Sequence, residues 1–368
     1  MEYSFNKYES LAEISNLNER WHYLHKNSIN PSIYNQFDFI IESLKNFTYK
    51  NVKPFILSIE YKGELIALFY LQTDVEKRMG TPVKVIEFSA LEEIDKPYPV
   101  IHKQHETRSW KAFFEYLASS KNWHILSLIE QTSEKINIIS KAASSNDHIY
   151  RINDDKSGPI IDLTIGWENF WSQHKKMRKK LYKLQKKYTE RLTFEIKPGA
   201  QLIDQYISIE RNSWKNGKLG ISKKSNFINF YKNLAARLPE KQFYIGILSL
   251  DGHAISGEIA YTQGSTVYFC HGCYDSNFKT YSPGMVSTSL FIQFFMDSNT
   301  FSKGDFLCGY AGYLDAWSDN ICHTQRVDIY RSSLVTYAFF FLRFIRKLTP
   351  AIILRIIRSA NALLKQNT

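Results

Sequence analysis

The sequence has 368 residues, of which 44% are hydrophobic and 15% aromatic, and it carries a net charge of +11. This length and this share of apolar residues exclude a disordered chain and predict one large or two medium folded domains. The positive charge favours an anionic partner, such as a phosphate-rich cofactor, nucleic acid or an anionic lipid surface, without choosing among them.

The sequence also bears on the cellular compartment and on metal binding. The N-terminal residues are polar, and no stretch approaches the ~20 apolar residues that a membrane span needs. Cys270 and Cys273 form one Cys-x-x-Cys, but Cys308 and Cys322 do not supply the second pair of a zinc site. We therefore expect a cytoplasmic protein with free cysteines and no bound metal.

The first half of the chain is expected to run from helices into strands. Two apolar strands flank Lys62-Gly63, which is a hairpin signal. In chain order, we predict helices over Leu17–Asn27 and Gln36–Asn46, strands over Phe55–Tyr61, Glu64–Thr73 and Lys84–Ala90, a helix over Thr107–Ser119 and a strand over His124–Glu130.

The second half repeats this order around Asp251-Gly252, a strong hairpin dipeptide. A cluster of Ser, Asn, Asp and Gly over Ser144–Pro159 predicts the linker that precedes it. We predict strands over Leu192–Lys197, Phe243–Leu250, His253–Thr262, Thr266–Cys273, Asp305–Gly309 and Val327–Arg331, and helices over Ile203–Lys215, Ser225–Leu238 and Pro283–Asp297.

Because the element order matches in the two halves, we interpret the chain as a duplicated α+β unit. The copies differ between strand and helix. The second copy has Lys279–Gly284 there, with Pro and Gly at the helix start. The first copy has Ala90–His105, which is acidic early on and lacks that start. Any chemistry of this loop is therefore expected only in the second copy.

The loop Thr280–Val286 is the strongest candidate for an anion site. A turn opens a helix there, and helix N-termini present unpaired amides and the positive end of the helix dipole. Gly284 would let an anion approach the backbone closely. Together these features favour a pyrophosphate-binding site, although an ordinary strand-to-helix turn has the same pattern.

A second candidate is the segment Phe170–Thr193, where nine Lys or Arg residues between Lys175 and Arg191 face one acid, Glu190. Its apolar residues keep helical spacing, so we expect an amphipathic basic helix. This helix either presents a solvated basic face or binds a nucleotide phosphate, an anionic substrate, a membrane surface or RNA.

Several residues of the second half are candidates for catalysis or acceptor binding. Glu210, Trp214 and Lys215 are expected on one helix, where a carboxylate beside an apolar ring can act as a base. His271 is an alternative base, and a tyrosine at the end of the late strand could protonate a thiolate leaving group. The candidates near that strand are Asp305, Tyr310 and Tyr313.

The sequence lacks the loops of serine hydrolases, nucleotide hydrolases and zinc proteases. It instead resembles the CelD-like branch of GNAT acetyltransferases over roughly Gly166–Trp317. The resemblance rests on the ordered runs His174–Leu181, Glu210 with Ser213-Trp214-Lys215, Phe230-Tyr231, Gly272-x-Tyr274-Asp275, Tyr281-Ser282-Pro283-Gly284 and Asp305-Phe306-Leu307-x-Gly309.

This resemblance implies two tandem GNAT-like domains, each a mixed, mainly antiparallel sheet flanked by helices, over residues 1–150 and 160–331. It also implies acyl transfer from acetyl-CoA or another acyl-CoA to an amine or hydroxyl, often in exopolysaccharide or cell-envelope synthesis in bacteria. Tyr313-Leu314 departs from the family, which usually has Tyr-Lys there.

The roles expected of single residues follow from the resemblance. Glu210 would be the base and Tyr313 the acid. Trp214, Lys215, Asp305 and Tyr310 would bind a small-molecule or glycan acceptor. The cofactor would contact the strand residues Phe269, Cys270 and His271 and the loop residues Tyr281, Ser282, Pro283, Gly284, Met285 and Val286.

Two other functions remain open. FemAB-type transferases share the tandem plan, and in such an aminoacyl transferase the basic helix would hold tRNA. A non-catalytic scaffold of a polysaccharide synthesis complex is the second alternative. The basic, apolar tail over 332–368 is compatible with peripheral contact to an anionic membrane at its inner face, or with a helix packed on the domain.

Overall fold

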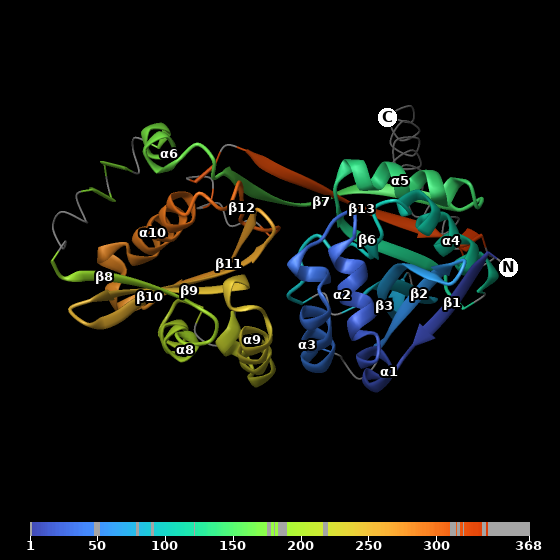
Figure 1. Cartoon of the computed structure of the whole chain (residues 1–368), viewed down its shortest axis with the longest axis horizontal. Helices are drawn as coiled ribbons and strands as arrows, with labels where there is room; N and C mark the ends of the chain where they lie inside the picture. The colour runs from blue at the N-terminus through green and yellow to red at the C-terminus, as the bar shows by residue number, and fades with distance from the viewer. Residues whose placement is uncertain are drawn as a thin grey trace, which may run out of the picture.

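The structure is a computed structural model of the chain, which folds into two halves bridged by long strands (Figure 1). It describes residues 2–47, 52–78, 81–89, 92–120, 122–174, 178–179, 181–182, 190–215, 220–309, 314, 317–318, 320–332 and 336–337. Residues 175–177, 180 and 183–189 of the predicted basic helix and almost all of the predicted tail lie outside these residues, so both stay predictions.

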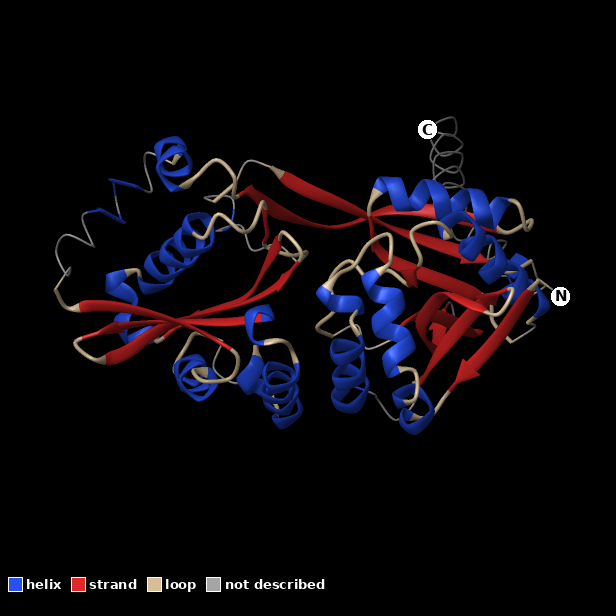
Figure 2. Ribbon diagram, in the orientation of Figure 1, coloured by secondary structure: helices blue, strands red, loops and turns tan. Residues whose placement is uncertain are grey.

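The first half contains a sheet with helices on its faces (Figure 2). Its strands are β1 (Tyr3–Tyr8), β2 (Lys53–Tyr61), β3 (Glu64–Arg78), β4 (Thr81–Phe88), β5 (Val100–Ile101), β6 (Ile125–Gln131) and β7 (Ile149–Asp162). Its helices are α1 (Leu11–Ser15), α2 (Asn18–Lys26), α3 (Phe37–Phe47), α4 (Glu106–Ser119) and α5 (Ser133–Ser144), with the 3₁₀ turn η1 (Ile33–Asn35).

The second half repeats this plan. Its strands are β8 (Leu192–Pro198), β9 (Phe243–Leu250), β10 (His253–Gln263), β11 (Thr266–Tyr274), β12 (Lys303–Asp305) and β13 (Ile321–Tyr330). Its helices are α6 (Trp167–Gln173), α8 (Ile203–Arg211), α9 (Ser225–Arg237) and α10 (Pro283–Asp297), with 3₁₀ turns η2 (Ile221–Lys223), η3 (Glu240–Gln242) and η4 (Ser276–Tyr281).

Strands β7 and β13 join the two halves into one sheet. The strand order is β1-β2-β3-β4-β6-β13-β7-β12-β11-β10-β9-β8, and the paired β7 and β13 are the long strands that cross between the halves in Figure 1. The predicted linker over 144–159 does connect the halves, but most of it is not irregular, because it forms strand β7. Its polar residues pair with β13, which Gly/Ser/Asn composition alone did not indicate.

The two predicted hairpins are confirmed and nearly identical. Lys62 and Gly63 have φ values of 52° and 85°, and Asp251 and Gly252 have 51° and 79°. Positive φ at both central residues is the turn that matches the twist of paired strands. The repeated hairpin, with helices before it and strand and helix after it, supports the interpretation as a duplicated unit.

Helices α8 and α9 cover one face of the second sheet and α10 covers the other (Figure 1). Helix α9 also packs on α3 of the first half through aromatic rings: the Phe47 ring lies 4.7 Å from that of Phe227 and 4.9 Å from that of Phe230. A single hydrophobic cluster thus runs from the first half into the α8–α9 side of the second.

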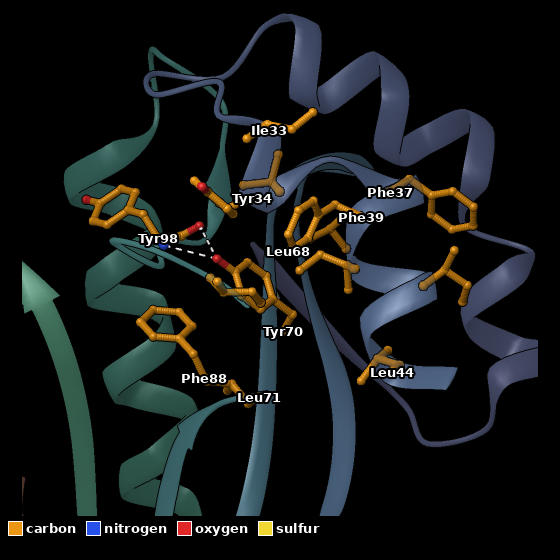
Figure 3. Packing of buried hydrophobic residues seen from close by; sticks show 14 of the residues in the cluster. Ile33, Tyr34, Phe37, Phe39, Leu44, Leu68, Tyr70, Leu71, Phe88 and Tyr98 are labelled. Atoms are coloured by element: carbon orange, nitrogen blue, oxygen red, sulfur yellow. Dashed lines mark hydrogen bonds between the residues drawn. The ribbon is translucent and has the colours of Figure 1, made fainter. Parts of the chain in front are cut away.

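The segment after β4 is anchored in the first core by Tyr98 (Figure 3). The Tyr70 hydroxyl donates to the Tyr98 carbonyl at 3.0 Å and accepts from the Tyr98 amide at 3.0 Å. Gln131 holds the same segment by donating to the Pro97 carbonyl at 2.8 Å. These bonds fix residues 92–98, which reach toward the second half.

One predicted helix ends early. The helix expected over 203–215 stops at Arg211, because the chain then turns to meet the end of β11. Ser213 forms a β-bridge with Asp275, and the Ser276 amide donates to the Asn212 carbonyl at 3.0 Å. None of the described helices is both long and apolar enough to cross a membrane.

Candidate functional site

Strands β11 and β12 stop pairing partway along β11, because β12 ends at Asp305. They pair in parallel only from Thr266 to Tyr268 opposite Lys303 to Asp305. Strand β11 then continues to Tyr274, and within the described residues its edge from Phe269 onward has no strand partner on the β12 side. Unpaired amides and carbonyls on such an edge can bind an extended ligand that contains amide groups.

A β-bulge lies at the point where the strands part. Ile259 of β10 pairs with His271, whereas the next residue, Ala260, pairs with Phe269, so Cys270 is the extra residue. A bulge twists a strand and redirects the side chains that follow it. The predicted strand segment Phe269–His271 therefore coincides with the irregular part of β11.

The strand leads through η4 into the start of α10. Ser282 adopts a left-handed conformation (φ 48°), and Pro283 occupies the first helical position, as the sequence predicts. The first turn of α10 has no acidic residue, and the Gly284 amide has no hydrogen-bond partner among the described residues. The amide end of a 15-residue helix thus faces the turn that follows β11.

Gly284 packs closely against a neighbouring ring. A Cβ at this position would lie 3.1 Å from the Tyr274 ring, which is tighter than ordinary van der Waals contact. Pro283 and Val286 are buried, whereas Tyr281 and Met285 are partly buried against the core under α10. The loop residues assigned to the cofactor therefore lie together at the start of α10.

The strand residues assigned to the cofactor point in different directions. The Phe269 ring is buried and stacks on Phe306 at 4.9 Å, so it belongs to the core. The Cys270 thiol donates to the Ile259 carbonyl at 3.1 Å, and burial raises its pKa. Only His271 contacts polar groups across the boundary between the halves.

Glu258 on β10 is a buried carboxyl group near this region that the sequence analysis missed. Ser287 and Thr288 of α10 donate to its Oε1 at 2.7 and 2.8 Å. Burial raises the pKa of Glu258 to about 7, although these hydrogen bonds and Lys215 act to lower it. The sequence signal that could have identified Glu258 is its charge within a largely apolar strand, between Ile255 and Ile259.

Glu210, the predicted base, is fully buried at the end of α8. The Ser222 amide donates to its Oε2 at 2.6 Å, and the Lys215 ammonium lies 3.5 Å from its Oε1. Trp214 does not share its face, because that side chain is outside the helix and 57% exposed. The structure brings Lys215 to Glu210 but separates both from Trp214, and the base role of Glu210 stays a prediction.

Asp305, assigned to the acceptor, is buried in a charged cluster between the halves. The Lys96 ammonium, from the first half, lies 3.0 Å from Asp305 Oδ1 and 2.5 Å from Asp95 Oδ2. Burial alone would raise the pKa of Asp305, but Lys96 and Lys303 outweigh burial and lower it. This carboxylate is thus occupied by lysines rather than open to solvent. Tyr310 and Tyr313 lie outside the described residues.

Asp95, Glu130 and Cys308 also lie within metal-ligand distance of one another in this cluster. Their oxygens are already occupied: Lys96 contacts Asp95, and Lys156 lies 2.6 Å from Glu130 Oε1. The Cys308 amide donates to Asp95 Oδ1 at 2.6 Å. These contacts make the cluster a cross-link between the halves, and the expectation of no metal stays a prediction.

Comparisons with known proteins bear on the family and the fold. Residues 173–314 match the family model of the acetyltransferase (GNAT) domain. Among curated proteins, none matches the chain in sequence.

Solved structures share the fold over nearly the whole chain. FemX has a TM-score of 0.59 at 10% identity, covering 88% of this chain and 98% of its own. The C-terminal domain of a putative lysylphosphatidylglycerol synthetase from Agrobacterium fabrum has a TM-score of 0.55 at 10% identity, covering 92% and 97%. L-PGS from Bacillus licheniformis has 0.50 at 11% identity, covering 88% and 95%.

At these identities the structures establish the fold alone. That fold is a mixed sheet flanked by helices in two copies, as the sequence predicts. The finer assignment to the CelD-like branch is not reached by these matches. Residues 173–314 match a GNAT acetyltransferase domain, which supports acyl transfer as the class of reaction.

Proposed function

We propose that the chain transfers an acyl group from acyl-CoA directly to an amine or hydroxyl group of a small-molecule or glycan acceptor. The observation that carries the proposal is the edge of β11 that continues beyond the end of β12, with the start of α10 following that edge in the chain. An acyl-CoA offers both matching parts: an extended chain with amide groups, and a diphosphate.

In the proposed arrangement, the turn Ser282–Val286 holds the diphosphate and the edge of β11 holds the amide-containing arm. The thioester then lies near the bulge at Cys270, where a backbone amide can polarise its carbonyl. The acceptor nitrogen or oxygen attacks the carbonyl carbon, and the carbon–sulfur bond breaks. The acceptor proton passes to a base, and the thiolate that leaves takes up a proton.

The acceptor class rests on the resemblance to the CelD-like branch, which points to amino sugars or envelope polysaccharide precursors. The test combines acetyl-CoA with sugar-nucleotide and amino-sugar acceptors and measures release of free thiol, with acetylated product identified by mass spectrometry. We expect acceptor-dependent thiol release. A folded protein that binds no CoA in calorimetry would contradict the proposal.

Aminoacyl transfer is the second candidate. It is supported by the net charge of +11 and by the fold shared with FemX and with the synthetase domain over most of each chain. A protein that uses aminoacyl-tRNA would bind tRNA with an affinity that falls steeply with salt. Such binding, together with no detectable binding of CoA, would favour this function over the first.

A further inference from the structure

Three polar side chains meet across the boundary between the halves, beside the bulge of β11. His271 comes from β11, Tyr231 from α9, and Glu93 from the segment after β4 in the first half. The Tyr231 hydroxyl donates to Glu93 Oε2 at 2.5 Å and also contacts His271 Nε2. His271 Nε2 lies 3.2 Å from the same Glu93 oxygen.

These contacts favour one tautomer of the neutral His271 ring. An ionised carboxylate only accepts hydrogen bonds, so Nε2 must be protonated to bond Glu93. The single hydroxyl proton of Tyr231 is already directed to Glu93, so the Tyr231 oxygen can only accept from Nε2. In the neutral ring, Nδ1 then keeps its lone pair, and it has no partner among the described residues.

The position of His271 links this ring to the proposed reaction. It is the residue after the bulge at Cys270, on the part of β11 that extends beyond the pairing with β12. The His271 side chain is 17% exposed and that of Glu93 is 14% exposed, so both are shielded but still reachable. Tyr231 is fully enclosed, and burial, with Glu93 next to it, raises its pKa well above the ordinary value.

The first half therefore supplies one member of the group. In the second half the loop between strand and helix leads to the amide end of α10, whereas the corresponding segment of the first half, residues 92–98, crosses to the second half. Tyr98 anchors this segment in the first core, as Figure 3 shows, and Lys96 ties it to Asp305. Glu93 is thus presented to His271 by a segment whose following residues, Lys96 and Tyr98, are anchored.

We propose that His271 is the general base of the acyl transfer and that Glu93 and Tyr231 are its positioning residues. The inference rests on the proposed function and deepens it. Nδ1 takes the proton of the acceptor amine or hydroxyl as the new carbon–nitrogen or carbon–oxygen bond forms. Glu93 holds Nε2–H and stabilises the imidazolium, which later returns the proton toward the thiolate or solvent.

The experiment measures acetyl-CoA affinity and steady-state transfer for His271→Ala, Glu93→Gln and Tyr231→Phe in the full chain. A base contributes about 10²–10⁴-fold to the rate. We expect His271→Ala to lower kcat by about that factor with unchanged CoA affinity, and added imidazole to restore part of the rate. Glu93→Gln should lower kcat at least about tenfold, because a carboxamide can direct an N–H to Nε2 and reverse the tautomer.

The control is Glu92→Gln, which removes a charge one residue away, whose carboxylate lies 3.9 Å from Lys223. This variant should keep kcat within about twofold, because an exposed pair contributes little. A His271→Ala enzyme with a nearly normal rate would overturn the inference. Loss of rate that imidazole does not restore, accompanied by a lowered melting temperature, would also overturn it and assign the group a structural role.

The measurements distinguish a failure of the proposed acyl transfer from a failure of the base assignment. If the wild-type chain neither binds CoA nor releases thiol, the proposed acyl transfer fails and the base assignment fails with it. If the wild-type chain transfers acyl groups and His271→Ala does so equally well, only the assignment of His271 fails.

Discussion

Glu258 is a carboxyl group whose protonation depends on the fold. Burial raises its pKa to about 7 in the folded protein, above the ordinary value of 4.5 that it regains in the unfolded chain. The folded state therefore binds this proton more tightly, and the contribution of Glu258 to stability is complete below pH 4.5. That contribution is lost as the pH rises through about 7.

Glu258→Gln should remove this dependence, because a carboxamide stays neutral and its oxygen can still accept from Ser287 and Thr288. The variant should gain stability over the wild type between pH 5 and pH 8 by on the order of 3 kcal/mol. Urea denaturation at both pH values measures the difference. Glu195→Gln, at an exposed position on β8, is the matched control and should show no such trend.

At the residue scale, spacing identifies turns and helix starts better than it identifies site residues. Pro283 and Gly284 are recognisable because a helix start constrains φ and close approach locally. Glu93 and Tyr231 come from segments far apart in sequence, and only tertiary packing brings them to His271. The sequence therefore indicates a lone strand histidine as a possible base, but it does not indicate which residues are its partners.

The crossing strands are the elements that the sequence conceals. Strand β7 is polar over Asn153–Ser157, so its composition resembles a linker. Its strand form depends on pairing with β13, which is more than 150 residues away in the chain. By contrast, the two hairpins are encoded by local dipeptides and were predicted. Helix α8 ends early for the same non-local reason, since Ser213 pairs with Asp275.

At Gly158, strand β7 packs closely against the turn that follows β12. A Cβ at Gly158 would lie 1.7 Å from the Leu307 carbonyl oxygen and 2.6 Å from its carbon. Leu307 itself has a positive φ of 65°, so its backbone has little freedom to move away.

Gly158→Ala should therefore destabilise the protein by at least about 3 kcal/mol, the upper part of the range for overpacking. Thermal or urea unfolding measures the loss. Ser157→Ala, one position earlier on the same strand, should stay within about 1 kcal/mol of the wild type. An alanine at position 158 that costs no more than this control would contradict the close approach of β7 to Leu307.

At the scale of the whole molecule, Lys96 is a partly buried charged link between the halves. Its ammonium lies between two buried carboxylates, Asp95 and Asp305, which raise its pKa above the ordinary value although burial alone would lower it. Lys96 also has a positive φ of 47°. The backbone there is held in a strained conformation by these contacts.

Replacing Lys96 with Met should cost about 3–5 kcal/mol, because it leaves buried carboxylates without their partner. Denaturation midpoints measure the loss of stability. Because Lys303 still pairs with Asp305 in the variant, we expect a loss near the lower end of this range. Lys197→Met breaks an exposed pair with Glu195 and should cost less than about 1 kcal/mol. Equal costs for the two variants would show that the junction does not depend on Lys96.

The most direct test of the account compares acetyl-CoA with acetyl-pantetheine by isothermal titration calorimetry. The two ligands share the thioester and the amide-containing arm, but acetyl-pantetheine lacks the diphosphate that the start of α10 is proposed to hold. We predict that acetyl-CoA binds at least about tenfold more tightly, a difference of about 1.4 kcal/mol. Equal affinity for the two ligands, or no binding of acetyl-CoA by the folded chain, would contradict the proposed site.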